Sequence, residues 1–221
     1  MAWQQCAVGK RVRDTAKHSR RPISISAGFS DVGLYEESGK RIFDVAAASI
    51  AVAVLSPILA AVGAAIKLED RGPALFVQER AGRDGASFAI YKFRSMEVGT
   101  ANVPSGEMAA PSVTRVGKLI RRTNLDELPQ LFNIVKGDMS VVGPRPPLPS
   151  QADVIGARYS SGALRLSPGL TGWAQVNSFD GMDPLEKARY DGEYAKNISF
   201  RKDLEIILRT FVYLLKPPPK Y

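Results

Sequence analysis

The longest apolar run in the chain is Val45–Ile66, in which 22 consecutive residues carry no charged side chain. Because about 20 apolar residues are enough to cross the hydrocarbon core of a bilayer, this run predicts a membrane helix, with a helix buried in protein as the alternative. Ser56-Pro57 lies at its centre, where the proline removes an amide donor and clashes with the carbonyl four residues earlier. We therefore expect the helix to kink at this Ser-Pro break, with the Ser56 hydroxyl bonding to a freed backbone group.

Basic residues flank the apolar run on both sides. Lys40 and Arg41 precede it, and Lys67 and Arg71 follow it. Since positively charged flanks favour the cytoplasmic side of a membrane, both ends of the helix are expected there. A re-entrant helix, which bends at its centre and leaves by the leaflet that it entered, satisfies both the proline and the charges. A straight span remains the alternative.

The rest of the pattern divides the chain into three regions. Residues 1–38 mix basic residues with Ser, Gly and Pro and show no apolar period, so they are predicted to form a basic mobile tail. Residues 39–70 hold the re-entrant membrane helix. Residues 71–221 are predicted to form a compact cytoplasmic domain of the α+β class, with a small hairpin sheet and several helices.

Within the cytoplasmic domain, ALFVQER and SFAIYKF alternate around the turn Gly82–Gly85 and predict a β-hairpin. Residues 99–113 carry Gly, Pro and Ser and are expected to form a loop. Arg115–Arg122 is a short basic helix candidate, and Leu128, Leu131, Phe132 and Val135 follow at helical spacing up to Gly137. The apolar segment Leu204–Leu215 predicts a C-terminal helix that is too short to cross a bilayer. It is expected to lie in the membrane interface or to pack on the domain.

Composition narrows the chemistry. The net charge is +8, which suggests an anionic partner such as nucleic acid, an anionic membrane surface or a phosphorylated substrate. With Cys6 as the single cysteine, no internal disulfide or cysteine-based metal site can form. With His18 as the single histidine, a Ser-His-Asp triad or a histidine-rich zinc site is disfavoured. Any catalysis is therefore expected to use carboxylates, Lys and Arg.

Two adjacent carboxylates, Asp126 and Glu127, follow the basic pair Arg121 and Arg122. Their structural explanation is helix capping, because Asn124 at an N-cap with Glu127 three residues later matches a capping box. Their functional explanation is that an ionised Asp126 beside cations can attack phosphorus or bind Mg²⁺, with Glu127 sharing the metal or assisting proton transfer. The residues alone leave both open.

Seven motifs, in order, carry a resemblance to a known family. They are KRIFDV at Lys40–Val45, the central Ser56-Pro57, QERAGRDG, YKFRSM at Tyr91–Met96, LIRRTNLDELPQLFNIVKGDMSVVGPRP, PGLTGWAQVN at Pro168–Asn177, and YAKNISFRKDLEII. With these the chain resembles the bacterial sugar transferases, the monotopic phosphoglycosyl transferases, over about Lys40 to Lys216. It is similar to the minimal class that has the catalytic core without further transmembrane helices.

The resemblance implies transfer of a sugar-1-phosphate from a UDP-sugar donor to undecaprenyl phosphate, with release of UMP and Mg²⁺ as cofactor. It implies that Asp126 is the nucleophile, forming a phosphosugar-aspartyl intermediate, and that Asp126 and Glu127 are the metal ligands. Residues 71–221 would then be a catalytic domain on the cytoplasmic face of the bacterial inner membrane. The product would start the assembly of an O-antigen, a capsule, an exopolysaccharide or a glycoprotein glycan.

A site where a diphosphate meets a lipid phosphate needs several cations. Arg145 is the first candidate, because Pro144 and Pro146 fix its backbone and a guanidinium suits phosphate bidentately. A solvated loop charge is the alternative. The remaining candidates are Arg80, Lys92, Arg94 and Arg121, with a solvated strand face as the alternative for Lys92 and Arg94. Trp173 is expected in the core or at the membrane interface rather than stacked on uridine.

Several alternatives stay open. The sugar is expected to be an N-acetylated amino or deoxyamino hexose, with galactose or glucose as the alternatives. A nucleotide-sugar hydrolase would use the same adduct, and a non-catalytic basic membrane scaffold or a nucleic-acid binder would share the charge, although no nucleic-acid-binding module is recognisable. The sequence is compatible with a homodimer without requiring one.

Overall fold

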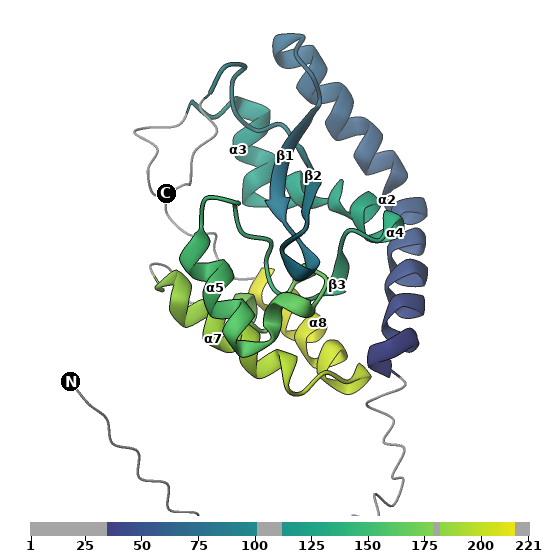
Figure 1. Ribbon diagram of the computed structural model, residues 1–221. Helices are drawn as coiled ribbons and strands as arrows, with labels where there is room; N and C mark the ends of the chain where they lie inside the picture. Colours follow the sequence, from purple (N-terminus) through teal and green to yellow (C-terminus); the bar gives the residue numbers. More distant parts are fainter. Residues whose placement is uncertain (1–34, 101–111, 179–181, 215–221) are drawn as a thin grey trace, which may run out of the picture.

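The computed structural model describes residues 35–100, 112–178 and 182–214 (Figure 1). The predicted tail up to residue 34 and most of the predicted loop 99–113 lie outside the described residues. The elements, in chain order, are η1 (Tyr35–Gly39), α2 (Lys40–Asp70), β1 (Leu75–Ala81), η2 (Arg83–Gly85), β2 (Ser87–Phe93), α3 (Arg115–Arg122), η3 (Leu125–Glu127), α4 (Gln130–Lys136), β3 (Ser140–Val142), α5 (Ala152–Ser161), η4 (Ala163–Arg165), β4 (Gly169–Thr171), α6 (Trp173–Asn177), α7 (Pro184–Ala195) and α8 (Phe200–Leu214).

Helix α2 (31 residues) continues through Ser56-Pro57, so the chain stays helical at the predicted Ser-Pro kink. Figure 1 shows that its ribbon changes direction about halfway along. Pro57 has no N–H to donate to the carbonyl of Ala53, four residues earlier. The Ser56 hydroxyl donates to that same oxygen at 2.8 Å. The Ser56 hydroxyl thus replaces the missing N–H of Pro57 as the donor to Ala53. The helix therefore bends at this point and does not end.

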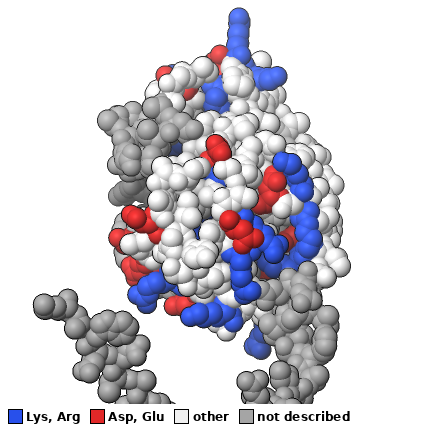
Figure 2. Space-filling model, in the orientation of Figure 1, with Lys and Arg blue, Asp and Glu red and all other residues white. Residues whose placement is uncertain are grey.

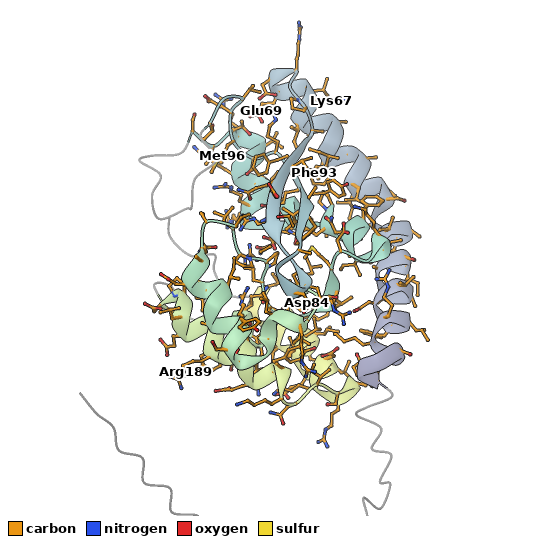
Figure 3. The ribbon with its side chains drawn as sticks, in the orientation of Figure 1. Lys67, Glu69, Asp84, Phe93, Met96 and Arg189 are labelled. Carbon is orange, nitrogen blue, oxygen red and sulfur yellow. The ribbon has the colours of Figure 1, made fainter. Side chains whose placement is uncertain are left out.

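One face of α2 packs on the domain along both halves. In the first half Ala48 is buried with Ile90 of β2 and Ile134 of α4. In the second half Ile66 is buried with Phe93, which Figure 3 shows between the hairpin and α2, and with Ile120 of α3. Both halves of α2 therefore contact the same domain.

The other face of α2 is apolar and exposed, with Ile50 65% and Val54 69% exposed. The helix is long and apolar enough to cross a membrane, and only 11% of its most apolar window is buried. Figure 2 shows few charged side chains over the upper right of the molecule, where the second half of α2 lies. The alternative of a helix buried in the protein core is therefore wrong.

The predicted hairpin is confirmed, with β1 and β2 antiparallel from Leu75↔Phe93 to Ala81↔Ser87. A second sheet, in which the short strands β3 and β4 pair in parallel, is a feature that the sequence analysis missed. A Cβ on Gly143 would lie 2.4 Å from the carbonyl oxygen of Ser167, and a Cβ on Gly169 would lie 2.1 Å from the Gly143 nitrogen. The two backbones touch, which is possible only because both residues are glycines.

Helices α5, α7 and α8 cover the end of the domain where β3 lies (Figure 1). Val142 of β3, Tyr194 of α7 and Ile206 of α8 form the core there. Asp203 is fully buried and accepts hydrogen bonds from Tyr194, from Lys40 at 2.6 Å and from Tyr35 at 2.7 Å. Residues 35–38 of the predicted tail therefore belong to η1 and are tied to the domain through Tyr35.

Helix α8 begins at Phe200, four residues earlier than predicted, and is described to Leu214. Ile206 on one face is fully buried, whereas Leu204, Leu208 and Phe211 on another face are 43%, 58% and 63% exposed. These exposed residues recur at helical spacing, so α8 has an apolar stripe that faces away from the domain. The helix therefore packs on the domain through Ile206, and its position in a membrane interface stays a prediction.

Candidate active site

The short turn η3 orients the two adjacent carboxylates. Leu125 packs into the cluster with Ile66 of α2, and Leu128, three residues later, packs into the cluster with Ala48 of α2. Residues three apart lie on one side of a 3₁₀ turn, so Asp126 and Glu127 are turned away from the apolar clusters. The fold thus anchors the two carboxylates beside α2, with their side chains outside the apolar clusters.

The predicted capping box is wrong. Asn124 has a left-handed backbone (φ 54°) and its side chain forms no cap hydrogen bond. Glu127 instead reaches across to two cations, Lys92 of β2 at 2.9 Å and Arg145 at 2.6 Å. The side chain of Glu127 therefore serves the charged cluster and not the helix end.

The two carboxylates titrate in opposite directions. Burial by itself would raise the pKa of Glu127, but Arg145 and Lys92 outweigh it and hold that pKa well below its usual range. Burial and the neighbouring charge of Glu127 raise the pKa of Asp126 to about 6, although Lys92 and Arg121 oppose the rise. Neighbouring acids with separated pKa values are typical of sites where each has its own task.

Asp126 forms no hydrogen bond or ion pair with another side chain in the part of the chain that the structure describes. A half-buried carboxylate in this state is ionised near pH 7.5 yet poorly solvated. Its oxygen is consequently available to a cation or to an electrophile such as phosphorus.

Three of the predicted cations converge. Arg80, Lys92 and Arg145, together with Ile90, Gln130 and Pro146, line a small hollow that is partly open to solvent, which we name the cationic hollow. Burial and the nearby charge of Arg145 lower the pKa of Arg80 to about 10. Burial also lowers the pKa of Lys92, against the pull of Glu127. Crowded cations of this kind favour an anionic ligand, as predicted for a phosphate site.

The other two predicted cations lie elsewhere. Arg121 donates to the Ser95 hydroxyl at 2.8 Å and is close enough to Asp126 to lower its pKa. Arg94 is buried beyond the end of β2, where it pairs with Asp70 and donates to the carbonyl of Pro73 at 2.6 Å. Arg94 therefore holds the C-terminal end of α2 through Asp70 and does not line the cationic hollow.

Asn133 of α4, which sequence analysis missed, sets the distance across the site. It is fully buried, accepts from the Tyr91 N–H at 3.0 Å and donates to the Ala89 carbonyl at 2.7 Å. These bonds hold α4 against β2, which places Lys92 opposite Glu127.

Arg158 and Asp191 were also missed, because an ion pair between α5 and α7 leaves no short motif. They form a buried pair at 2.7 Å, and Arg158 also donates to the backbone carbonyl of Arg145 at 2.7 Å. The side chain of Arg145 is 52% exposed and pairs with Glu127, whereas Arg158 holds its backbone. Arg158 therefore supports the loop that presents the Arg145 guanidinium.

Trp173 has its ring covered by cations. Lys202 lies 3.3 Å and Arg209 5.0 Å from the ring centroid, and the ring nitrogen donates to Glu193 at 3.2 Å. The ring packs beside the cluster that contains Val142. This environment agrees with the expectation of a packing role and not with stacking on uridine.

Mg²⁺ binds through one or two carboxylates and completes its shell with water and substrate phosphates. No group of three or more metal-binding side chains occurs within residues 35–100, 112–178 and 182–214. Asp126 fits such a cation because its carboxylate has no competing side-chain partner among the described residues, whereas Glu127 Oε1 already accepts from Lys92 and Arg145.

Comparisons with known proteins agree with the geometry. The model of the family described as bacterial sugar transferase matches residues 35–217. A UDP-glucose:undecaprenyl-phosphate glucose-1-phosphate transferase of Caulobacter vibrioides is 42% identical over 191 residues, covering 82% of this chain and 72% of that protein. A UDP-N-acetylgalactosamine-undecaprenyl-phosphate N-acetylgalactosaminephosphotransferase of Aeromonas hydrophila is 41% identical, covering 80% and 43%. The exopolysaccharide production protein ExoY of Rhizobium meliloti is 37% identical, covering 77% and 83%. The chain thus spans less than half of some relatives and most of others.

Proposed function

This chain belongs to the bacterial sugar transferase family, and on that premise we propose that it transfers a sugar-1-phosphate from a UDP-sugar to undecaprenyl phosphate. The observation that carries the proposal is the position of Asp126, an ionisable carboxylate without a side-chain partner among the described residues, beside a converging set of cations. UMP and a lipid-linked diphosphosugar are the products.

The proposed reaction has two steps. An Asp126 carboxylate oxygen attacks the β-phosphorus of the UDP-sugar, and the bond from that phosphorus to the bridging oxygen breaks so that UMP leaves. A phosphate oxygen of undecaprenyl phosphate then attacks the same phosphorus, and Asp126 leaves as a carboxylate. The pKa of Asp126 is about 6, so its carboxyl group is already ionised at neutral pH. No general base is therefore needed to deprotonate the nucleophile.

The surrounding side chains have separate proposed tasks. Arg80, Lys92 and Arg145 stabilise the phosphate charge that moves to the leaving group. Glu127 keeps Lys92 and Arg145 in place while the site is free of substrate. Arg121 lies on the Asp126 side and favours the ionised nucleophile.

Mg²⁺ is proposed as the cofactor, held by the Asp126 carboxylate, with Glu127 as a second candidate ligand. When bound, Mg²⁺ would neutralise phosphate charge at the site. Asp126 can serve both as nucleophile and as metal ligand because its two carboxylate oxygens have no side-chain partner among the described residues.

We propose that α2 is re-entrant and that the enzyme is monotopic, on the cytoplasmic face of the inner membrane. Near its two ends, Asp44 accepts from the Val141 N–H at 2.9 Å and Asp70 pairs with Arg94, so both ends are tied to one domain. A helix tied at both ends supports entry and exit through one leaflet. Its neighbours Leu125 and Leu128 then keep Asp126 close to the membrane surface, where a polyprenyl phosphate group resides.

The expectation of an N-acetylated sugar stays a prediction, since relatives at 42% and 41% identity are named for glucose and for N-acetylgalactosamine. The test is UMP release by the purified protein with undecaprenyl phosphate and a panel of UDP-sugars that includes glucose, galactose and their N-acetylated forms. Release with one donor is expected.

Two controls separate the rivals. If UMP release continues at full rate without undecaprenyl phosphate, the protein is a hydrolase. If no donor is used and Asp126 never acquires a phosphosugar when UDP-sugar is added alone, the enzymatic proposal is wrong and a scaffold is favoured.

A further inference from the structure

Gln130 is a buried residue that lines the cationic hollow and has no role in the reaction proposed above. It is the first residue of α4 and is 3% exposed. Its amide nitrogen Nε2 is shielded from solvent and finds no hydrogen-bond acceptor among the described residues. Buried amide donors are nearly always bonded, and leaving one unbonded destabilises the fold, so this donor calls for an acceptor that the described residues do not supply, either a water or a ligand oxygen.

The neighbours of Gln130 define the chemistry of that acceptor. The other polar side chains that line the hollow are Arg80, Lys92 and Arg145, all of them cations. Glu127 neutralises part of their charge from beside Lys92 and Arg145. Several cations and one neutral donor around a small space suit an oxyanion that accepts several hydrogen bonds, which is a property of a phosphate group.

We propose that the Gln130 carboxamide donates a hydrogen bond to an oxygen of a substrate phosphate group seated in the cationic hollow. This inference rests on the proposed function, to which it adds a residue that binds the phosphate. A neutral donor can orient the phosphate without adding to the repulsion among the cations. The phosphate of the nucleotide donor and that of the lipid acceptor present the same oxygens, and the experiment separates them.

The test compares the wild type with Gln130→Met, which keeps the length of the side chain and removes the donor. Gln130→Glu keeps the shape and replaces the donor with an acceptor, so it serves if the first variant fails to fold. Gln151→Met is the matched control, because Gln151 bonds to the Leu148 N–H and does not line the hollow.

Three measurements are made in detergent: the affinity for inorganic pyrophosphate by calorimetry, the KM for UDP-sugar and the KM for undecaprenyl phosphate. Gln130→Met is expected to weaken pyrophosphate binding by about 10- to 100-fold, the usual effect of losing a hydrogen bond to a charged group. One of the two KM values should rise by a similar factor. Gln151→Met should leave all three unchanged.

The outcomes are distinct. A higher KM for UDP-sugar assigns the hollow to the donor phosphate, and a higher KM for undecaprenyl phosphate assigns it to the lipid; either supports the proposal. Changes below twofold in all three measurements overturn it. A wild type that uses no UDP-sugar refutes the proposed function, and pyrophosphate binding then still decides the role of Gln130.

A merely structural role is excluded by melting temperature. If Gln130 awaits a ligand, Gln130→Met should melt at or above the wild type without ligand, because an unbonded buried donor is removed. A clear fall in melting temperature, with pyrophosphate binding intact, would make Gln130 a packing residue.

Discussion

Replacing Asp126 with Asn should stabilise the folded protein at neutral pH while removing its activity. The pKa of Asp126 lies at about 6 in the fold against 3.8 for an unperturbed aspartate. The folded state therefore binds more protons than the unfolded state between these values, and stability falls as the pH rises from about 4 to about 6. Asn carries no charge at any of these pH values and should avoid that loss.

The magnitude follows from the two pKa values. At about 1.36 kcal/mol for each pH unit, the difference corresponds to roughly 3 kcal/mol at full strength. Because Asp126 is only half-buried, solvent screening reduces the expected gain to about 1–2 kcal/mol. For a chain of this length that is about 2–8 °C in melting temperature.

The assay is thermal unfolding in detergent with a chelator present, at pH 4 and at pH 7.5, beside UMP release at pH 7.5. Asp126→Asn should melt higher than the wild type at pH 7.5, should lose that advantage at pH 4 and should release no UMP. Asp84→Asn is the control for a change of one charge, since the Asp84 side chain is 70% exposed and Asn tolerates its positive φ. An equal or lower melting temperature at pH 7.5, or normal UMP release, would refute the reasoning.

Three further predictions concern pH, packing and metal. UMP release should fall on the acid side with an apparent pKa near 6 as Asp126 is protonated, and a rate that stays constant down to pH 5 would contradict this. Gly143→Ala should lower the melting temperature sharply, because its Cβ would meet the Ser167 carbonyl at 2.4 Å, whereas Gly156→Ala, with nothing within 4 Å, should raise stability by up to about 1 kcal/mol. Equal melting temperatures for the two would argue against backbone contact. EDTA should abolish UMP release and Mg²⁺ should restore it, and full activity in EDTA would exclude the cofactor.

Much of the fold could be predicted where the signal is local. The hairpin was found because two alternating apolar runs flank a turn at Gly82–Gly85, and α4 ends at Gly137 as its sequence indicates. The strands β3 and β4 were missed because each has three residues and their pairing joins segments nearly 30 residues apart. Short strands are determined by their partners, which local patterns do not contain.

The site divides along the same line. The sequence by itself determined which groups are available for chemistry, namely an acidic pair and several cations. Because the chain has one His and one Cys, it also disfavoured catalysis by a histidine-based triad or a cysteine-based metal site. Tertiary structure decided how they are used. It turned Glu127 from a helix cap into the partner of Lys92 and Arg145, moved Arg94 to the end of α2 and brought Gln130 into the hollow. The reason is physical: composition and short-range spacing are properties of the chain, whereas a pKa, an ion pair or an unbonded buried donor depends on residues that only folding brings within a few ångströms.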